Sequence, residues 1–204
     1  MKRPSIHFTS RAVAAFAAAL FFVPAASNAA PPASVPAPAA SPAPAAPVQF
    51  SDPAMQFTAP AGYFKLNVPP HDPTNFSQST IVAAFVKSPG RDEQRLITVS
   101  MENWDGFSLT GFEGTNENEL RSKVDSLFVS RKEQTTLSNG MPAFWMVLSV
   151  GSGFASQKWY QYVWVDGMRA VTVAIKAKLG ELDEKDARAA LSNLSGVAYP
   201  RNRQ

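Results

Sequence analysis

The residue types that most often carry hydrolytic or metal chemistry are scarce in this chain. It contains no cysteine and two histidines, His7 and His71. A zinc site is not expected, because zinc normally takes three or four Cys, His or carboxylate ligands. A Ser-His-Asp triad would have to use His71, which lies in a polar loop, and no G-x-S-x-G nucleophile motif occurs. We therefore expect no catalytic set, no metal site and no cofactor.

A pair of carboxylates is the remaining route to catalysis. Asp105 and Glu113 lie in the stretch N-W-D-G-F-S-L-T-G-F-E-G-T-N (103–116), where aromatic side chains could hold a sugar. Glycoside hydrolases use two such carboxyl groups about 5–10 Å apart in one cleft. A carboxylate-based hydrolase is accordingly kept as an alternative to a protein without enzymatic activity.

Aromatic residues supply the candidate binding sites. Those in 103–116 alternate with glycines and acids, which favours a lid folded onto the core over a surface for a partner, because so many exposed rings are uncommon on soluble monomers. The aromatics between 145 and 164 lie in strand-like runs, where a core position is favoured over a ligand platform. The candidates for contact with a ligand or partner are Trp104, Phe107, Phe112, Trp145 and Trp159.

The run from Lys158 to Lys176 predicts a β-hairpin at the centre of a sheet. Asp166-Gly167 separates K-W-Y-Q-Y-V-W-V from M-R-A-V-T-V-A-I-K, and Asp-Gly between two such runs is typical of a type I′ turn. This turn would place Val165 opposite Met168. Alternation puts one set of side chains on each face, and both sets are mostly apolar, so we expect both faces to be covered. One set is Tyr160, Tyr162, Trp164, Val171, Val173 and Ile175; the other is Trp159, Gln161, Val163, Met168, Ala170, Thr172 and Ala174.

The remaining pattern predicts strands, one helix, four strands and a second helix. Strands are expected at 55–58, 63–68, 81–86, 96–101, 132–138 and 144–150, with an Asn139-Gly140 hairpin turn between the last two. The first helix is expected to begin at Asn116 through a capping box with Glu119 and to bury Leu120, Val124, Leu127 and Phe128. The second is expected to begin at Asp183. The fold class is α+β, with an antiparallel sheet and two main helices.

The N-terminal segment predicts export. Lys2, Arg3 and Arg11 precede twelve apolar residues, 12–23, and Ser27-Asn28-Ala29 offers a cleavage site. Twelve residues are too few for a membrane span, which needs about 20. Residues 30–50 are almost all Ala and Pro, which favours an extended linker, either a spacer or a leader without a role. We expect a signal peptide (1–29), a disordered linker (30–50), one domain (51–200) and a tail (201–204).

Charge argues against nucleic acid as a partner. The chain has 19 Lys and Arg against 16 Asp and Glu, and the excess is accounted for by the three basic residues of the predicted signal peptide. A basic binding surface is therefore not expected on the mature protein. We also expect no stable membrane insertion after cleavage, and a secreted or periplasmic location.

The folded part resembles the PsbP/Mog1-like α/β/α sandwich family. The resemblance lies in A-P-A-G-Y-F-K-L-N-V-P (59–69), T-L-S-N-G-M-P-A (136–143), Y-Q-Y-V-W-V-D-G-M-R-A-V-T-V (160–173) and the closing helix, and it spans about 53–199. It implies an antiparallel sheet of seven or eight strands between helices. It also implies binding or scaffolding of other proteins without enzymatic activity.

The leading hypothesis from the sequence is an exported, non-enzymatic binding or scaffold domain that acts on a protein partner in the cell envelope or outside the cell. Besides the hydrolase, a second alternative is a carrier of a small hydrophobic ligand. That ligand would occupy a cavity between helix and sheet, lined by Phe128 and the hairpin aromatics.

Overall fold

The computed structural model describes residues 49–52, 55–70, 79–87, 95–104, 106, 108–153, 156–167 and 169–196. The predicted signal peptide, the linker as far as residue 48, and the tail lie outside the described residues. His71 also lies outside them.

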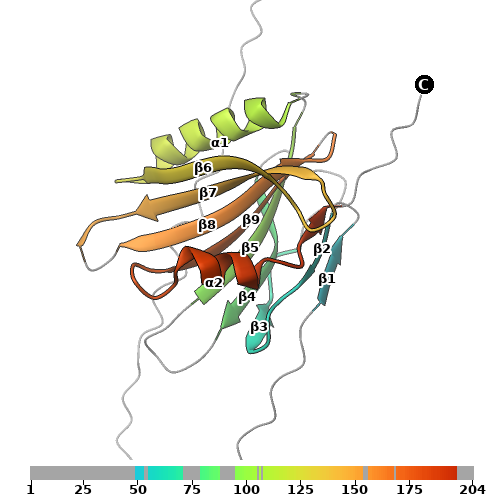
Figure 1. The fold of residues 1–204 in the computed structure, drawn as a ribbon, viewed down its shortest axis with the longest axis horizontal. Coiled ribbons are helices and arrows are strands. Elements are labelled where there is room, and N and C mark those ends of the chain that lie inside the picture. The colour runs from blue at the N-terminus through green and yellow to red at the C-terminus, as the bar shows by residue number, and fades with distance from the viewer. Residues whose placement is uncertain are drawn as a thin grey trace, which may run out of the picture.

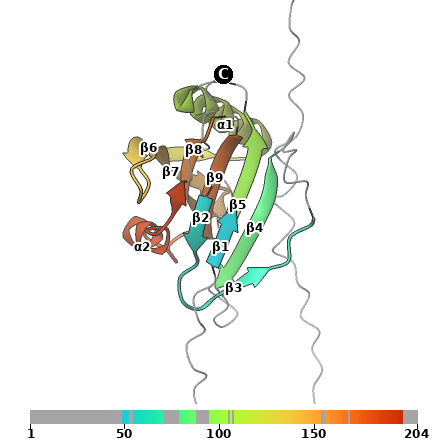
Figure 2. The ribbon, with the colours of Figure 1, turned by 90° about the vertical axis from the view of Figure 1, so that its right-hand side faces the viewer.

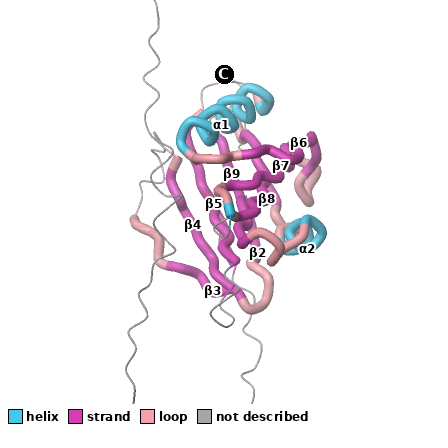
Figure 3. Tube along the Cα trace, turned by 90° about the vertical axis from the view of Figure 1, so that its left-hand side faces the viewer, coloured by secondary structure: helices cyan, strands magenta, loops and turns pink. Residues whose placement is uncertain are grey.

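Seven antiparallel strands form the main sheet, in the order β3-β4-β5-β9-β8-β7-β6 (Figure 1). This confirms the expected α+β class and the expected number of strands. The β8–β9 hairpin lies in the middle of the sheet, while β3 and β6 lie at its two ends (Figure 3). The strands are β3 (Tyr63–Leu66), β4 (Thr80–Lys87), β5 (Arg95–Asn103), β6 (Phe128–Thr136), β7 (Pro142–Val150), β8 (Gln157–Val165) and β9 (Arg169–Lys178).

The β8–β9 turn differs from the prediction by two residues in register. Val165 pairs with Ala170 rather than with Met168, and the Asp166 N–H donates to the Arg169 carbonyl at 3.0 Å. The Asp166 carboxylate also accepts from the Arg169 N–H at 3.1 Å, so the Asp side chain closes the turn that it was expected to occupy centrally. Because a shift of two preserves side-chain alternation, the predicted division of the hairpin into two faces still holds.

Each face of the sheet carries its own core. Helix α1 (Leu109–Lys123) covers one face, where Phe112 packs with Met146, Leu148 and Trp159. The other face is covered by helix α2 (Glu184–Ala190) and a small sheet. The small sheet consists of β1 (Gln49–Asp52), β2 (Met55–Thr58) and β10 (Ser195–Gly196), in the order β1-β2-β10 (Figure 2).

The predicted start of the first helix was wrong. α1 begins at Leu109, with Ser108 as its N-cap and the Ser108 hydroxyl accepting the Gly111 N–H at 2.9 Å. Asn116 therefore lies inside the helix. The helix also ends earlier than expected, at Lys123, so Leu127 and Phe128 are not on its stripe, and Phe128 opens β6.

The second helix and the second hairpin turn agree with the prediction. Asp183 caps α2 by accepting the Asp186 N–H at 2.7 Å. Gly140 has φ +84°, the left-handed conformation that a tight turn requires and that glycine adopts at little cost. Strand β1 was not predicted; it begins at Gln49, within the last two residues of the expected linker.

No helix within the described ranges is long and apolar enough to cross a membrane.

Candidate functional site

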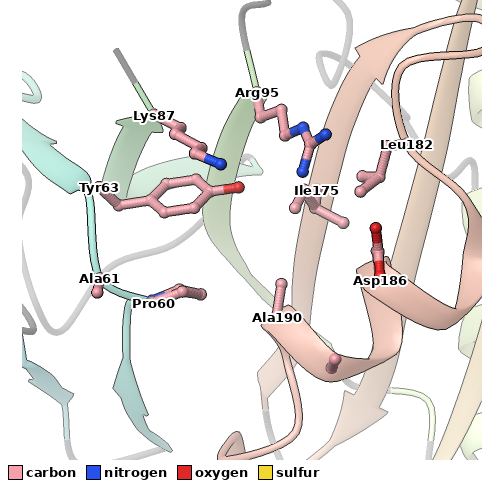
Figure 4. Close-up of a pocket in the computed structure, with 10 residues that line it drawn as sticks. Pro60, Ala61, Tyr63, Lys87, Arg95, Ile175, Leu182, Asp186 and Ala190 are labelled. Carbon is pink, nitrogen blue, oxygen red and sulfur yellow. The ribbon is translucent and has the colours of Figure 1, made fainter. Parts of the chain in front are cut away.

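An open pocket of about 290 Å³ lies between α2 and the end of the main sheet nearest β3 (Figure 4). Its volume corresponds to roughly ten water molecules, which suits a small ligand or the end of a longer one. The lining comes from the β2–β3 turn, the four neighbouring strands β3, β4, β5 and β9, the loop before α2, and α2: Pro60, Ala61, Tyr63, Lys87, Arg95, Ile175, Leu182, Asp186, Ala189 and Ala190.

Sheet register brings three polar lining residues into one row. Tyr63 on β3 pairs with Lys87 on β4, and Lys87 pairs with Arg95 on β5. Directly opposed residues in adjacent strands share a face, with Cβ atoms about 4.5–5.5 Å apart. The Tyr63 hydroxyl and the Lys87 ammonium both point toward Arg95 (Figure 4). The row is therefore a continuous set of hydrogen-bond donors with two positive charges.

Arg95 is only partly satisfied by the protein. Its Nη2 donates to the Glu181 carbonyl at 2.7 Å, which ties the start of β5 to the loop before α2. Its Nε is buried and has no hydrogen-bond partner in the described part of the chain. A buried donor without a partner costs about 1–3 kcal/mol, so an acceptor entering the pocket would recover part of that cost.

The Tyr63 side chain is 4% exposed and serves as the wall beside the two cations. Burial raises the pKa of Tyr63 to about 12, and the charge of Arg95 opposes part of that rise. The phenol therefore remains protonated at neutral pH and can donate a hydrogen bond.

The opposite side of the pocket is mostly apolar. Ile175 of β9, Leu182 of the loop before α2, and Ala189 and Ala190 of α2 supply this apolar lining. Asp186, an exposed residue of α2, is the one acid in the lining. The pocket thus has hydrogen-bond donors and cations on one side and apolar side chains on the other. This arrangement suits a molecule with an anionic group and an apolar body.

The two tryptophans predicted as candidates, Trp145 on β7 and Trp159 on β8, lie in the core. Trp145 is fully buried; its Nε1 donates to Glu184 at 3.0 Å, and the Arg188 guanidinium lies 4.3 Å from its ring centroid. Trp159 is 4% exposed on the other face, with the Lys176 ammonium 4.1 Å from its ring centroid. Neither ring offers surface to a partner in this arrangement.

The candidates from 103–116 also pack inward where the structure describes them. Trp104 and Phe112 meet edge to face, with ring centroids 5.2 Å apart, and Phe112 is 1% exposed. This agrees with a segment folded onto the core, although half of it is helix rather than loop. Phe107 lies outside the described residues. None of the five predicted candidates lines the pocket.

The two alternative functions gain no support from the residues on which they were based. Glu113 is buried and ion-paired with Lys132 at 2.8 Å, and Asp105 lies outside the described residues. Phe128 is 64% exposed at the start of β6, so its expected place in the lining of an interior lipid cavity was wrong. No cluster of three or more potential metal ligands occurs among the described residues.

Sequence reasoning missed the pocket because its polar residues are far apart along the chain and individually ordinary. The available signal was their position: Tyr63 begins a strand, Lys87 ends one and Arg95 begins the next. Antiparallel pairing of consecutive strands would have placed them together, but the register is not readable from the sequence. No protein-family model matches this chain, and no match to it was found among curated proteins.

Proposed function

We propose that this protein is an exported, non-enzymatic binding or scaffold domain, and that it recognises a partner in the cell envelope or outside the cell through the pocket at Tyr63, Lys87 and Arg95. The observation that carries the proposal is the direct pairing of Lys87 with Arg95 at the mouth of this pocket. Like charges directly opposite each other destabilise a sheet, and such departures from good local design are expected at functional sites. An anionic group on the partner would neutralise the pair.

We also propose that the domain belongs to the PsbP/Mog1-like family. The support is the seven-stranded antiparallel sheet with α1 on one face and α2 on the other, together with the two glycine hairpins that carry the resemblance. Export is proposed on the N-terminal sequence alone. N-terminal sequencing of the mature protein should find Ala30 as its first residue; a chain that retains Met1 would contradict export by cleavage.

Site-specific photo-cross-linking in the producing cell tests the binding function. A benzoylphenylalanine in place of Ala61, an exposed lining residue, should form a defined adduct, whereas the same group in place of Asn118, exposed on α1, should not. Lys87→Glu should abolish the adduct at position 61. Lys185→Glu is the matched control, because Lys185 is an exposed α2 lysine outside the lining.

The proposal fails if position 61 gives no adduct, or if the adduct survives Lys87→Glu. Intact mass of the adduct distinguishes a protein partner from a small ligand. Far-UV circular dichroism of the Lys87→Glu protein confirms that a lost adduct does not reflect unfolding.

A further inference from the structure

The pocket is divided into two halves of different chemistry, and this division restricts what can fill it. Tyr63, Lys87 and Arg95 present a hydroxyl donor, an ammonium and a guanidinium from three adjacent strands. The other half is apolar: Ile175 on β9, the strand next to β5, and Leu182 before α2 are 0% and 5% exposed, and they line the pocket together with two α2 alanines. An inorganic anion would satisfy the first half and make no contact with the second.

We infer that the pocket takes a small amphipathic anion, with one carboxylate or phosphate group against Tyr63, Lys87 and Arg95 and a compact apolar body against Ile175, Leu182 and Ala190. This inference rests on the proposed function and specifies its ligand class. The ligand is either a free small molecule or the terminal group of a larger partner, since the pocket is open.

Three observations support the anionic head group. The Arg95 Nε is a buried donor without a partner in the described part of the chain, while its Nη2 is fixed by the Glu181 carbonyl. A guanidinium held on one side presents its remaining donors in a fixed plane, which suits the two oxygens of a carboxylate or phosphate. Lys87 adds a second cation directly across the strand pair.

The apolar half sets a limit on size and charge. A pocket of about 290 Å³ is at the lower end of ligand-binding sites, so the body is comparable to a single aromatic ring or a short branched chain. Asp186 stands on the α2 side of the lining. A second negative charge on the ligand would approach this carboxylate, which favours ligands with one anionic group.

Isothermal titration calorimetry of the full chain with five probes tests this ligand class. The probes are benzoate, phenyl phosphate, benzamide, benzylamine and inorganic phosphate. Benzoate or phenyl phosphate should bind about tenfold or more tightly than benzamide, which keeps the ring and lacks the charge. The same aryl anion should also bind more tightly than inorganic phosphate, which keeps the charge and lacks the ring. Tighter binding of benzoate assigns the head group to a carboxylate, and tighter binding of phenyl phosphate assigns it to a phosphate.

Variants locate the binding. Lys87→Gln should weaken the preferred aryl anion by about tenfold, and the matched Lys185→Gln should leave it unchanged. Tyr63→Phe, which removes only the hydroxyl, should weaken it several-fold. Because Tyr63 is buried, the rim variant Lys87→Gln decides the result if Tyr63→Phe does not fold.

The inference is overturned if benzamide, benzylamine or inorganic phosphate binds as tightly as the preferred aryl anion, or if no probe binds at about 10 mM. If all small probes fail while the cross-link at position 61 still requires Lys87, the proposed function stands and only this ligand class is lost. If the cross-link also fails, both are lost.

Discussion

Lys87, the last residue of β4, pairs directly with Arg95, the first residue of β5. Opposite charges at directly paired positions of an antiparallel sheet are stabilising, whereas like charges there are unfavourable. The hydrogen bond from the Arg95 guanidinium to the Glu181 carbonyl holds the side chain in place, so moving it away from Lys87 would cost this bond. The unfavourable pair of charges therefore lies at the mouth of the pocket.

This pair predicts opposite effects of one substitution on stability and on binding. Lys87→Gln should raise the free energy of unfolding by about 0.2–1 kcal/mol in low salt, because it removes the repulsion, and it should weaken binding in the pocket. Urea denaturation at low and high ionic strength measures the first effect, and the gain should shrink as salt screens the charges. Lys185→Gln is the control. A loss of stability in Lys87→Gln would contradict this account of the pair.

Trp145 should behave as a core residue rather than as a contact for a partner. Trp145→Ala should cost about 3–5 kcal/mol of unfolding free energy through loss of a fully buried ring. Trp145→Phe should cost about 1–2 kcal/mol, since it loses volume and the hydrogen bond to Glu184. Urea denaturation checks both values. If Trp145→Phe abolished the cross-link at position 61 without a loss of stability, the ring would have the binding role predicted from the sequence.

Glu102 should make the protein less stable as pH rises toward neutrality. Burial raises the pKa of Glu102 to about 7, the nearby carboxylate of Glu119 adds to the rise, and Lys123 opposes it. The folded state therefore holds a proton that the unfolded state has lost between about pH 4.5 and 7, so the free energy of unfolding falls across this window and does not recover above it. The total change is on the order of 1–3 kcal/mol.

Glu102→Gln is the matching variant for this pH dependence. It cannot ionise, so it should flatten this part of the stability profile and be more stable than the natural protein at pH 8. Urea midpoints measured from pH 4 to pH 8 test both expectations. An unchanged slope in Glu102→Gln would assign the pH dependence to other groups.

Replacing two glycines, Gly114 and Gly140, with alanine should change the free energy of unfolding in opposite directions. Gly114 lies inside α1, and a Cβ placed there meets nothing within 4 Å, so Gly114→Ala should stabilise the protein by about 0.5–1 kcal/mol through helix propensity and a less flexible unfolded chain. Gly140 also has open space around it but has φ +84°, so Gly140→Ala should destabilise by about 1 kcal/mol or more. Thermal unfolding of both variants makes the comparison. If both substitutions stabilised the protein, or both destabilised it, the argument from the backbone conformation of the two glycines would be contradicted.

The sequence was most informative where local chemistry decides the structure. The Asn139-Gly140 turn and the Asp183 cap depend on residues within a few positions of each other, and both were predicted correctly. The two faces of the β8–β9 hairpin were also predicted, because alternation survives the error in register.

The start of α1 was missed because packing outweighs propensity there. Gly111, Gly114 and Asn116 are poor helix formers, and they made 103–116 resemble a loop. The helix forms nevertheless, because the Ser108 cap and the burial of Phe112 against the sheet stabilise its first turns. That contact joins residues distant in sequence, as does the row of Tyr63, Lys87 and Arg95, so neither follows from spacing alone.

The short strand β2 has a consequence for how this domain can be joined to other chains. Gln56 pairs with Ser51 of β1 on one side and with Ser195 of β10 on the other, so the first and last described strands lie on either flank of one four-residue strand. A unit whose entry and exit are neighbours can be inserted into a loop of a host protein or circularly permuted without stretching its core. It also means that damage to β2 would release both ends of the fold at once.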